Sequence, residues 1–185
     1  MTDSSGDVFI YDYLVLATGA KNRPIDLPGL NEHALTFRSY QDALTLTARL
    51  KQLVRSQTLQ TQSDSIQPIS VVVVGGGASG VELACKVADY LGQRGRISLV
   101  ERGSQLLSNF PKGLRRQADR ALKNRQVNVL IETSVLAIDA DTVTLTQDET
   151  QTTRPSQLTL WAVGTQPRPW LGEQSVKQND YGQRL

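Results

Sequence analysis

The chain has 185 residues and a formal net charge of +2, with 39% hydrophobic and 21% charged residues. This length predicts one domain, or one and part of another, and is sufficient to bury a hydrophobic core. The small net charge argues against binding to nucleic acid or to an anionic membrane surface. The apolar runs are far shorter than the ~18 residues of a membrane-spanning helix, so no membrane span is expected.

The first element predicted along the chain is a strand over residues 8–17, which is rich in β-branched and aromatic residues and ends before Thr18 and Gly19. This strand would form half of a hairpin, so we expect the chain to be part of a larger protein. Residues 21–28 contain two prolines and predict an irregular connector.

A helix is expected after Ser39, because Asp42 follows three residues later as in a capping box. The Gln-, Ser- and Thr-rich residues 57–67 predict an exposed loop after this helix. Its apolar face has residues at helical spacing, namely Ala43, Leu46, Leu50, Leu53 and Val54.

The rest of the sequence is organised around residues 71–74, four valines that are typical of a strand buried on both faces. The glycines at 75, 77 and 80 then match G-x-G-x-x-G. In this motif Gly75 permits a tight turn, Gly77 lets the backbone approach a pyrophosphate, and Gly80 allows close packing of helix on strand. The N-terminus of the following helix would face the anion. That helix is predicted by apolar residues at Val81, Ala84, Val87, Ala88 and Leu91.

A second strand, residues 96–101, ends in Glu101, which lies 21 residues after Gly80. A carboxylate there can accept hydrogen bonds from the adenosine ribose hydroxyls, so the spacing predicts dinucleotide binding rather than a merely structural glycine turn. Glu101 also favours NADH over NADPH, because it would repel a 2′-phosphate. Arg102 is counter-evidence, since a nearby arginine can accommodate that phosphate.

Pro111 precedes a predicted amphipathic helix, and residues 127–131 predict a further strand. A right-handed crossover at each helix would make the three strands of this β-α-β-α-β unit parallel. The apolar face of the helix comprises Leu114, Ala118, Ala121 and Leu122.

Short alternating stretches at 135–138, 142–146 and around Gln151 predict an antiparallel meander, inserted before a last apolar strand at 158–163. The fold class expected is therefore α/β, with a Rossmann-like parallel sheet and an antiparallel β-meander insertion.

The chain has one cysteine and one histidine. Cys85 alone excludes an internal disulfide and a dithiol pair, and its place on the helix after the glycines favours a packing role. His33 is expected in a loop at the surface. No residues have the spacing of metal ligands, so no metal site is expected.

Three stretches together resemble the two-dinucleotide-binding flavoproteins of the pyridine nucleotide-disulfide reductase superfamily. They are residues 13–19, with the sequence Tyr-Leu-Val-Leu-Ala-Thr-Gly, the glycine motif and residues 161–167, with the sequence Trp-Ala-Val-Gly-Thr-Gln-Pro. Within this superfamily the chain looks most like the type II NADH dehydrogenases, the single-chain NADH:quinone oxidoreductases.

The resemblance implies that this glycine motif binds NAD(P)H and that the FAD-binding domain is split around it. It assigns residues 1–30 to a remnant of the FAD-binding domain and a connector, 31–165 to the NAD(P)H-binding domain, and 166–185 to a segment returning toward the FAD-binding domain. The family's N-terminal FAD fingerprint does not occur in this sequence. We therefore expect FAD to bind the full-length parent and not this chain alone, which should be colourless.

By the same resemblance, the parent passes a hydride from NADH to FAD and then electrons to a quinone, and the cofactors carry the chemistry. The glycine motif would hold the pyrophosphate and Glu101 the adenosine ribose, while residues 163–165 would lie near the nicotinamide. The cofactor-binding residues expected are Gly75, Gly76, Gly77, Ala78, Ser79, Gly80, Val81, Glu101, Arg102, Val163, Gly164, Thr165, Thr18 and Gly19.

Glu82 is the candidate catalytic residue and is expected in the first turn of the helix. Helical side chains lean toward the helix N-terminus, which would direct this carboxylate toward the nicotinamide. There it would stabilise the positive charge that develops as hydride leaves. The matching glutamate of the resembled family lies near the nicotinamide–flavin contact, which agrees with this direction. The alternative is an acid that only complements the helix dipole.

Two other functions remain open from the sequence. The chain could be the NAD(P)H-binding half of another flavoprotein reductase, acting on ferredoxin, a dithiol or an NADPH-linked quinone, or a nucleotide-binding module without turnover. The expected partners are NADH and, in the parent, a quinone, with a homodimer left open. The expected location is cytoplasmic, with peripheral attachment of the parent to the cytoplasmic face of a membrane left open. This chain alone is expected to be inactive.

Overall fold

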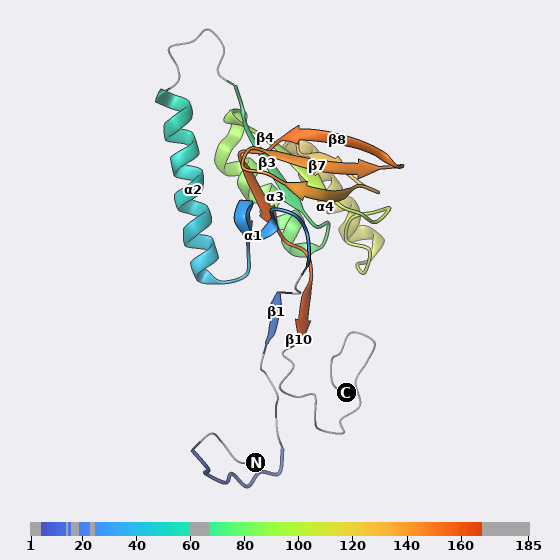
Figure 1. Cartoon of the computed structure of the whole chain (residues 1–185). Helices are drawn as coiled ribbons and strands as arrows, with labels where there is room; N and C mark the ends of the chain where they lie inside the picture. Colours follow the sequence, from blue (N-terminus) through green and yellow to red (C-terminus); the bar gives the residue numbers. More distant parts are fainter. Residues whose placement is uncertain (1–4, 14, 16–18, 23–24, 60–66, 168–185) are drawn as a thin grey trace. The chain divides into compact units, whose positions relative to one another are not determined.

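The structure is a computed structural model that describes residues 5–13, 15, 19–22, 25–59 and 67–167 (Figure 1). The chain divides into two compact units, residues 24–163 and a second unit made of residues 1–23 and 164–185. These boundaries differ by a few residues from the division at 30 and 165 expected from the sequence, and the domain assignment itself stays a prediction.

The larger unit is built on a parallel sheet of five strands in the order β2-β9-β3-β4-β5. The predicted parallel arrangement of the strands on either side of the glycine motif is confirmed. β9 lies between β2 and β3, so a strand late in the sequence pairs with two early ones. The strands are β2 (Ala34–Thr36), β3 (Ile69–Val74), β4 (Gly95–Val100), β5 (Asn128–Leu130) and β9 (Leu158–Trp161).

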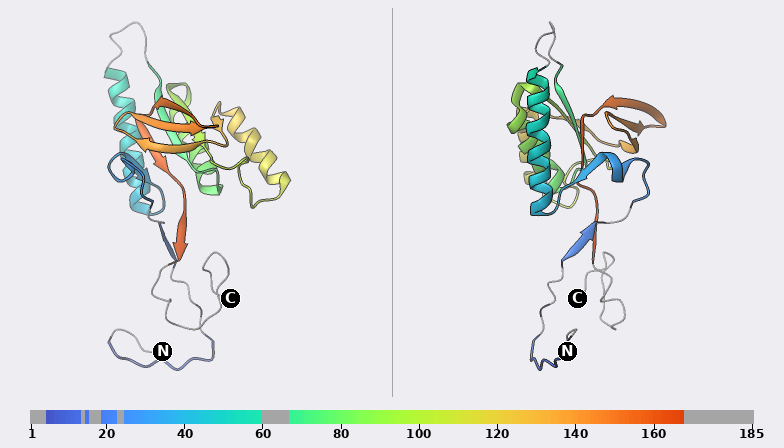
Figure 2. Two further views of the ribbon diagram at one scale, coloured as in Figure 1. Left: turned by 45° about the vertical axis from the view of Figure 1, so that its right-hand side comes forward. Right: turned by 60° about the vertical axis from the view of Figure 1, so that its left-hand side comes forward.

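The longer helices cover one face of this sheet, and a three-stranded antiparallel sheet covers the other together with a short helix, whose buried Leu30 packs in the same cluster as Ile138 and Val143 (Figures 1 and 2). The predicted meander insertion is confirmed as β6 (Ser134–Ile138), β7 (Thr142–Gln147) and β8 (Thr150–Pro155). The helices are α1 (Leu30–His33), α2 (Tyr40–Leu59), α3 (Ala78–Leu91) and α4 (Lys112–Asn124), with a 3₁₀ turn at Gly92–Arg94.

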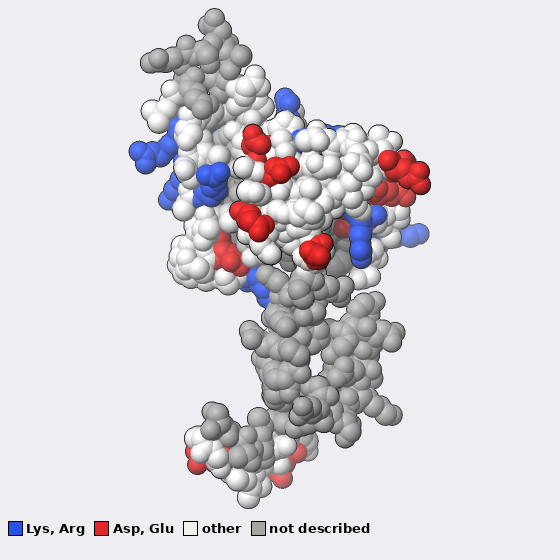
Figure 3. Space-filling model, in the orientation of Figure 1, with Lys and Arg blue, Asp and Glu red and all other residues white. Residues whose placement is uncertain are grey.

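Charged side chains of both signs are spread over the face of the larger unit seen in Figure 3, which agrees with the small net charge. Among the described residues, no helix combines the length and the apolar character needed to cross a bilayer.

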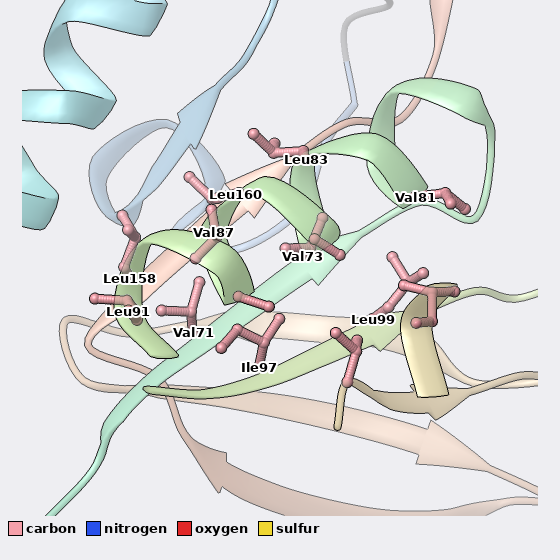
Figure 4. Packing of buried hydrophobic residues seen from close by; sticks show 14 of the residues in the cluster. Val71, Val73, Val81, Leu83, Val87, Leu91, Ile97, Leu99, Leu158 and Leu160 are labelled. Atoms are coloured by element: carbon pink, nitrogen blue, oxygen red, sulfur yellow. The ribbon is translucent and has the colours of Figure 1, made fainter. Parts of the chain in front are cut away.

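The alternation of side chains along β3 joins the three layers. Val71 and Val73 pack in the cluster that includes the helices, as Figure 4 shows for the contacts with α3. Val72 and Val74 point the opposite way and pack with residues of β6 and β7. All four valines are buried, each contributing roughly 1.5–3 kcal/mol of hydrophobic stabilisation. The four consecutive valines thus have an apolar layer on each side, as the uninterrupted run predicted.

The smaller unit contains one antiparallel pair among its described residues, β1 (Ala20–Asn22) with β10 (Thr165–Pro167). The predicted strand over residues 8–17 is wrong for its described residues, which show only an isolated bridge at Val8. Apolar side chains in this stretch are exposed, Ile10 by 98%. A strand requires a neighbour that accepts its backbone hydrogen bonds, and the described residues supply no ladder here.

Three local predictions also need correction. Leu114 was expected on the buried face of α4 but is 43% exposed, while Leu122 on the same helix is fully buried. The loop expected from residue 57 begins later, because α2 continues to Leu59, and residues 60–66 lie outside the described part. His33 is exposed as expected, but it ends the short helix α1 rather than lying in a loop.

The capping box at the start of α2 is confirmed. The hydroxyl oxygen of Ser39 accepts a hydrogen bond from the backbone N–H of Asp42 at 3.1 Å. The Asp42 carboxylate in turn accepts from the N–H groups of Ser39 and Arg38 at 2.8 and 2.9 Å. These bonds, the one from Ser39 first, lower the pKa of Asp42 below its ordinary value.

Because the pKa of Asp42 is lowered in the folded chain, its contribution to stability is present above its ordinary pKa and is lost as the pH falls through the lowered value. We predict that Asp42→Ala lowers the free energy of unfolding by about 0.5–1 kcal/mol at pH 7, and that this difference narrows below about pH 4. Urea denaturation of the two proteins at pH 7 and below about pH 4 measures this difference in the free energy of unfolding. Gln41→Ala, in the same helical turn, is the control, and an equal loss for Asp42→Ala at both pH values contradicts the prediction.

Candidate functional site

The glycine motif connects the carboxyl end of β3 to the start of α3, and two of its glycines are required by close contacts. A Cβ atom on Gly80 would lie 1.8 Å from the carbonyl oxygen of Gly75. Gly75 has a positive φ of 113°, and a Cβ there would lie 3.0 Å from both Ala162 O and Val163 Cγ2. Its N–H also donates to the carbonyl of Val100 at 2.8 Å. Gly75 therefore forms the turn and Gly80 permits the helix to pack against it, as the motif predicted.

Gly77 differs from these two glycines because it faces open space. A Cβ on Gly77 would meet no heavy atom within 4 Å, and its φ of −75° suits any residue. Gly77 is the N-cap of α3, and the first helical bond runs from the N–H of Val81 to the Gly77 carbonyl at 3.0 Å. Space for another molecule is therefore open at the end of the helix.

The N-terminus of α3 has the properties of an anion site. The N–H groups of its first turn have no partner within the helix, and no side chain among the described residues caps them. This turn contains no acidic residue, and Gly77, Ala78 and Ser79 are exposed. A phosphate could accept hydrogen bonds from these N–H groups, and the positive end of the helix dipole would add to the attraction.

Glu101 lies immediately after β4, and its carboxylate is bound to the glycine loop. Oε2 accepts a hydrogen bond from the N–H of Gly76 at 2.6 Å, and Oε1 accepts one from the N–H of Gly103 at 2.7 Å. The side chain is partly buried. Hydrogen bonds to a carboxylate are among the stronger ones in proteins, so Glu101 connects the ends of β3 and β4 at the site.

The Glu101 carboxylate can accept further hydrogen bonds in addition to these two. An ionised carboxylate offers about four lone-pair positions, and the two backbone N–H groups occupy two of them. Ribose hydroxyls could therefore still donate to it. Arg102, the next residue, is exposed.

Sequence reasoning missed the loop residues that pack under the glycine motif. Leu106 and Leu107, between β4 and α4, are buried in the core cluster. The N–H of Leu107 donates to the carbonyl of Gly76 at 2.8 Å, and Leu107 has a positive φ of 51°. That conformation costs a leucine roughly 1–2 kcal/mol. Two adjacent leucines within a polar loop were the signal that this segment folds back onto the core.

The position of Glu82 differs from the prediction. The helix begins at Ala78, inside the glycine motif, so Glu82 lies in the second turn and not in the first. Its side chain is exposed. The interpretation of Glu82 as a helix-dipole partner is thereby weakened, because that effect falls off within the first turn.

Cys85 lies one turn further along α3 and is partly buried against the core cluster, in agreement with the predicted packing role. Burial raises the pKa of its thiol above the ordinary value. Arg125 acts in the opposite direction, while Asp89 and Glu82 add to the increase.

The structure brings one of the remaining predicted residues to the glycine loop. Val163 is half-buried in the cluster on the side of the antiparallel sheet and lies against Gly75. Gly164 (φ 73°), Thr165 at the start of β10, and Gly19 (φ 69°) belong to the smaller unit. Thr18 lies outside the described residues.

A separate surface hollow of about 430 Å³ lies where α4 meets β5 and contains none of the predicted site residues. Its lining residues are Asp119, Leu122, Lys123, Gln126, Val127, Asn128 and Val129. We place the candidate site at the glycine motif instead, because there, within the part of the chain that the structure describes, uncapped helix N–H groups and a fixed carboxylate lie together.

Comparison with known proteins identifies the family of the chain. A sequence profile of the pyridine nucleotide-disulphide oxidoreductase family matches residues 1–184. The chain belongs to this family. Demethylphylloquinone reductase NdbB of Synechocystis sp. is 40% identical over 181 residues, which cover 98% of this chain and 43% of that protein. The type II NADH:quinone oxidoreductase of Haemophilus influenzae is 27% identical over 178 residues, or 83% of this chain and 39% of that protein.

A solved structure, NDH2 from Plasmodium falciparum in complex with NADH, matches this chain with a TM-score of 0.75 and 24% identity. The match covers 92% of this chain and 38% of that one, and it establishes the common fold. The resemblance to type II NADH dehydrogenases inferred from the sequence is confirmed. The chain spans less than half the length of the relatives it matches.

The contacts of the glycines give a test of the site's geometry. Gly80→Ala should lower the free energy of unfolding by more than about 2 kcal/mol, because the added methyl group overlaps the Gly75 carbonyl. Gly77→Ala adds a methyl group in open space and should leave stability within about 0.5 kcal/mol of the unsubstituted chain. Denaturant unfolding measures both. Equal effects of the two substitutions would show that the loop has a different geometry.

Proposed function

We propose that this chain is the NAD(H)-binding portion of a flavin-dependent oxidoreductase that passes a hydride from NADH to FAD and then electrons to a quinone. The observation that carries the proposal is the exposed, uncapped N-terminus of α3 with the Glu101 carboxylate fixed beside it. The names of the relatives, a demethylphylloquinone reductase and a type II NADH:quinone oxidoreductase, support a quinone as the acceptor.

The pyrophosphate of NADH would bind at the start of α3. Gly77, Ala78 and Ser79 are exposed, and the N–H groups of the first turn are directed out of the helix, so the residues present fit a dianionic group. Gly76 and Gly80, both buried, would support this loop from beneath, and Val81 closes the turn through its bond to Gly77.

Glu101 would accept hydrogen bonds from the adenosine ribose hydroxyls with the lone pairs that the backbone leaves free. A 2′-phosphate would instead place two negative groups together, and the two backbone bonds hold the carboxylate where it is. NADH is therefore the preferred nucleotide. Arg102 is exposed and follows Glu101, and it would reduce the preference for NADH over NADPH because it can pair with a 2′-phosphate.

The nicotinamide end of the nucleotide would lie toward Val163, beside the Gly75 turn. Gly164, Thr165, Thr18 and Gly19 are proposed to contribute at this end, following the resemblance of both stretches to the family's domain crossings. Glu82 is proposed to stabilise the positive charge that forms as hydride leaves.

The chemistry that FAD supplies when bound is acceptance of a hydride and delivery of electrons to a quinone. The part of this chain that the structure describes would contribute the nucleotide site, and its share of the reaction would be binding, orientation and the electrostatic effect proposed for Glu82. We propose that FAD binds only when the rest of the flavin domain is present.

Calorimetry with the 185-residue chain tests the nucleotide assignment. We predict that NADH binds at least about tenfold more tightly than NADPH, a difference of about 1.4 kcal/mol.

Gly77→Ala should strongly weaken the binding of both nucleotides, because its methyl group occupies the space that the pyrophosphate needs. Glu101→Gln should reduce the ratio between the two affinities, and this ratio is insensitive to a loop distortion that affects both ligands equally. NADPH binding as tight as NADH would contradict the predicted preference, and absence of binding by either would refute the site.

The role of Glu82 is tested in a protein that also carries the flavin domain. Glu82→Gln should slow reduction of the flavin by NADH by about tenfold or more, because a charge that stabilises the transition state is removed. The affinity for NADH should stay within a few-fold, since Glu82 lies outside the first turn of α3. Stopped-flow absorbance measures the rate, and Lys86→Gln, one turn further along the exposed side of α3, is the control. An unchanged rate would leave Glu82 without a catalytic role.

A further inference from the structure

The peptide groups on either side of Gly76 are held by the loop that follows β4. The N–H of Gly76 donates to Oε2 of Glu101 at 2.6 Å, and its carbonyl accepts from the N–H of Leu107 at 2.8 Å. A Cβ on Gly76 would lie 2.6 Å from Leu106 Cδ2 and 2.8 Å from Glu101 Cγ. Residues 101–107 therefore contact Gly76 through both hydrogen bonds and packing, and together they set its orientation. We call this set of contacts the Gly76 clamp.

Leu107 is the unusual member of the Gly76 clamp. Its φ of 51° lies in the left-handed region, which a leucine rarely adopts. Such a conformation persists only where the surrounding contacts impose it, and it occurs preferentially at functional sites. Here the side chain of Leu107 is 6% exposed within the core cluster, and its carbonyl accepts from the N–H of Phe110 at 2.9 Å. Burial of the side chain and this turn together direct the Leu107 N–H toward Gly76.

The clamp acts directly on the residue that would meet the ligand. Gly77 follows Gly76 and is the N-cap of α3. A rotation of the Gly76 peptide would therefore turn the N–H of Gly77 and the first-turn N–H groups away from a common point. The N–H that donates to Glu101 belongs to the preceding peptide, between Gly75 and Gly76, so a change in the backbone angles of Gly76 would also disturb the hydrogen bond to that carboxylate.

We infer that Leu107 is a positioning residue for the dinucleotide: its buried side chain holds a strained turn whose N–H fixes the Gly76 carbonyl. This fixes the Gly76–Gly77 peptide and its pyrophosphate-facing amide, and through the backbone of Gly76 it steadies the N–H that holds the ribose carboxylate. The inference rests on the proposed function, and it extends the site to a residue that contacts no ligand. The competing explanation is that Leu107 only fills the core beneath α3.

Three variants of the full 185-residue chain distinguish these explanations. Leu107→Ala removes the buried group that holds the turn, whereas Leu107→Met keeps a buried side chain of similar size. Leu50→Ala is the matched control, because Leu50 on α2 is 5% exposed in the same core cluster. NADH affinity is measured by calorimetry at a temperature where all three variants are folded. The backbone ¹H–¹⁵N signals of Gly76 and Gly77 are recorded without nucleotide.

Leu107→Ala should shift the Gly76 and Gly77 signals and weaken NADH binding by at least about tenfold. Leu107→Met should restore both properties. Leu50→Ala should lower the thermal midpoint as Leu107→Ala does, while leaving both signals in place and NADH affinity within about twofold.

Unchanged Gly76 and Gly77 signals in Leu107→Ala, or equal losses of affinity in Leu107→Ala and Leu50→Ala, would overturn the inference. Absence of NADH binding by the unsubstituted chain would refute the proposed function. The amide signals would still decide whether the Gly76 clamp depends on Leu107.

Discussion

The hydrogen bonds from the N–H groups of Gly76 and Gly103 to the Glu101 carboxylate are the interaction on which the candidate site depends. They join two loops that follow neighbouring parallel strands, and they do so around a partly buried charge. Removing the carboxylate would leave two backbone donors without their partner, at a cost of about 1–3 kcal/mol for each donor that water cannot reach. The same carboxylate is the proposed ribose acceptor. Loop geometry and the proposed nucleotide recognition therefore depend on the same side chain.

The central strand β3 fixes the positions of the residues that make this interaction. It pairs with β4 on one side and β9 on the other, and its alternate valines enter the two separate hydrophobic clusters. Because both faces are buried, a shift of register by one residue would exchange the two sets of valines. The carboxyl ends of β3 and β4 are thus fixed relative to each other, which places Gly75 within hydrogen-bonding distance of Val100 and Gly76 within that of Glu101.

Several predictions were wrong where they assumed a partner that the pattern does not specify. Residues 8–17 have the composition of a strand, but a ladder needs a neighbour, and the described residues form only a bridge at Val8. Leu114 has the spacing of a buried residue on α4, yet its side chain is 43% exposed, so none of the described segments covers it fully. Glu82 was expected one turn too early in the helix, because α3 begins at Ala78, inside the motif.

The elements that could be inferred from the sequence are those with local causes. The run of valines, the spacing of the glycines, the capping box at Ser39 and the alternation over residues 134–155 each reflect a period or a turn that a few neighbouring residues impose. Glu101 could be named as a site residue for the same reason, since it ends a strand at a known distance from the motif. Its bonds to Gly76 and Gly103, the left-handed turn at Leu107 and the insertion of β9 between β2 and β3 could not be inferred. These features depend on contacts between segments that are far apart in the sequence and meet only when the layers pack. The pattern of residues within one segment does not indicate which backbone groups of another segment will lie next to it.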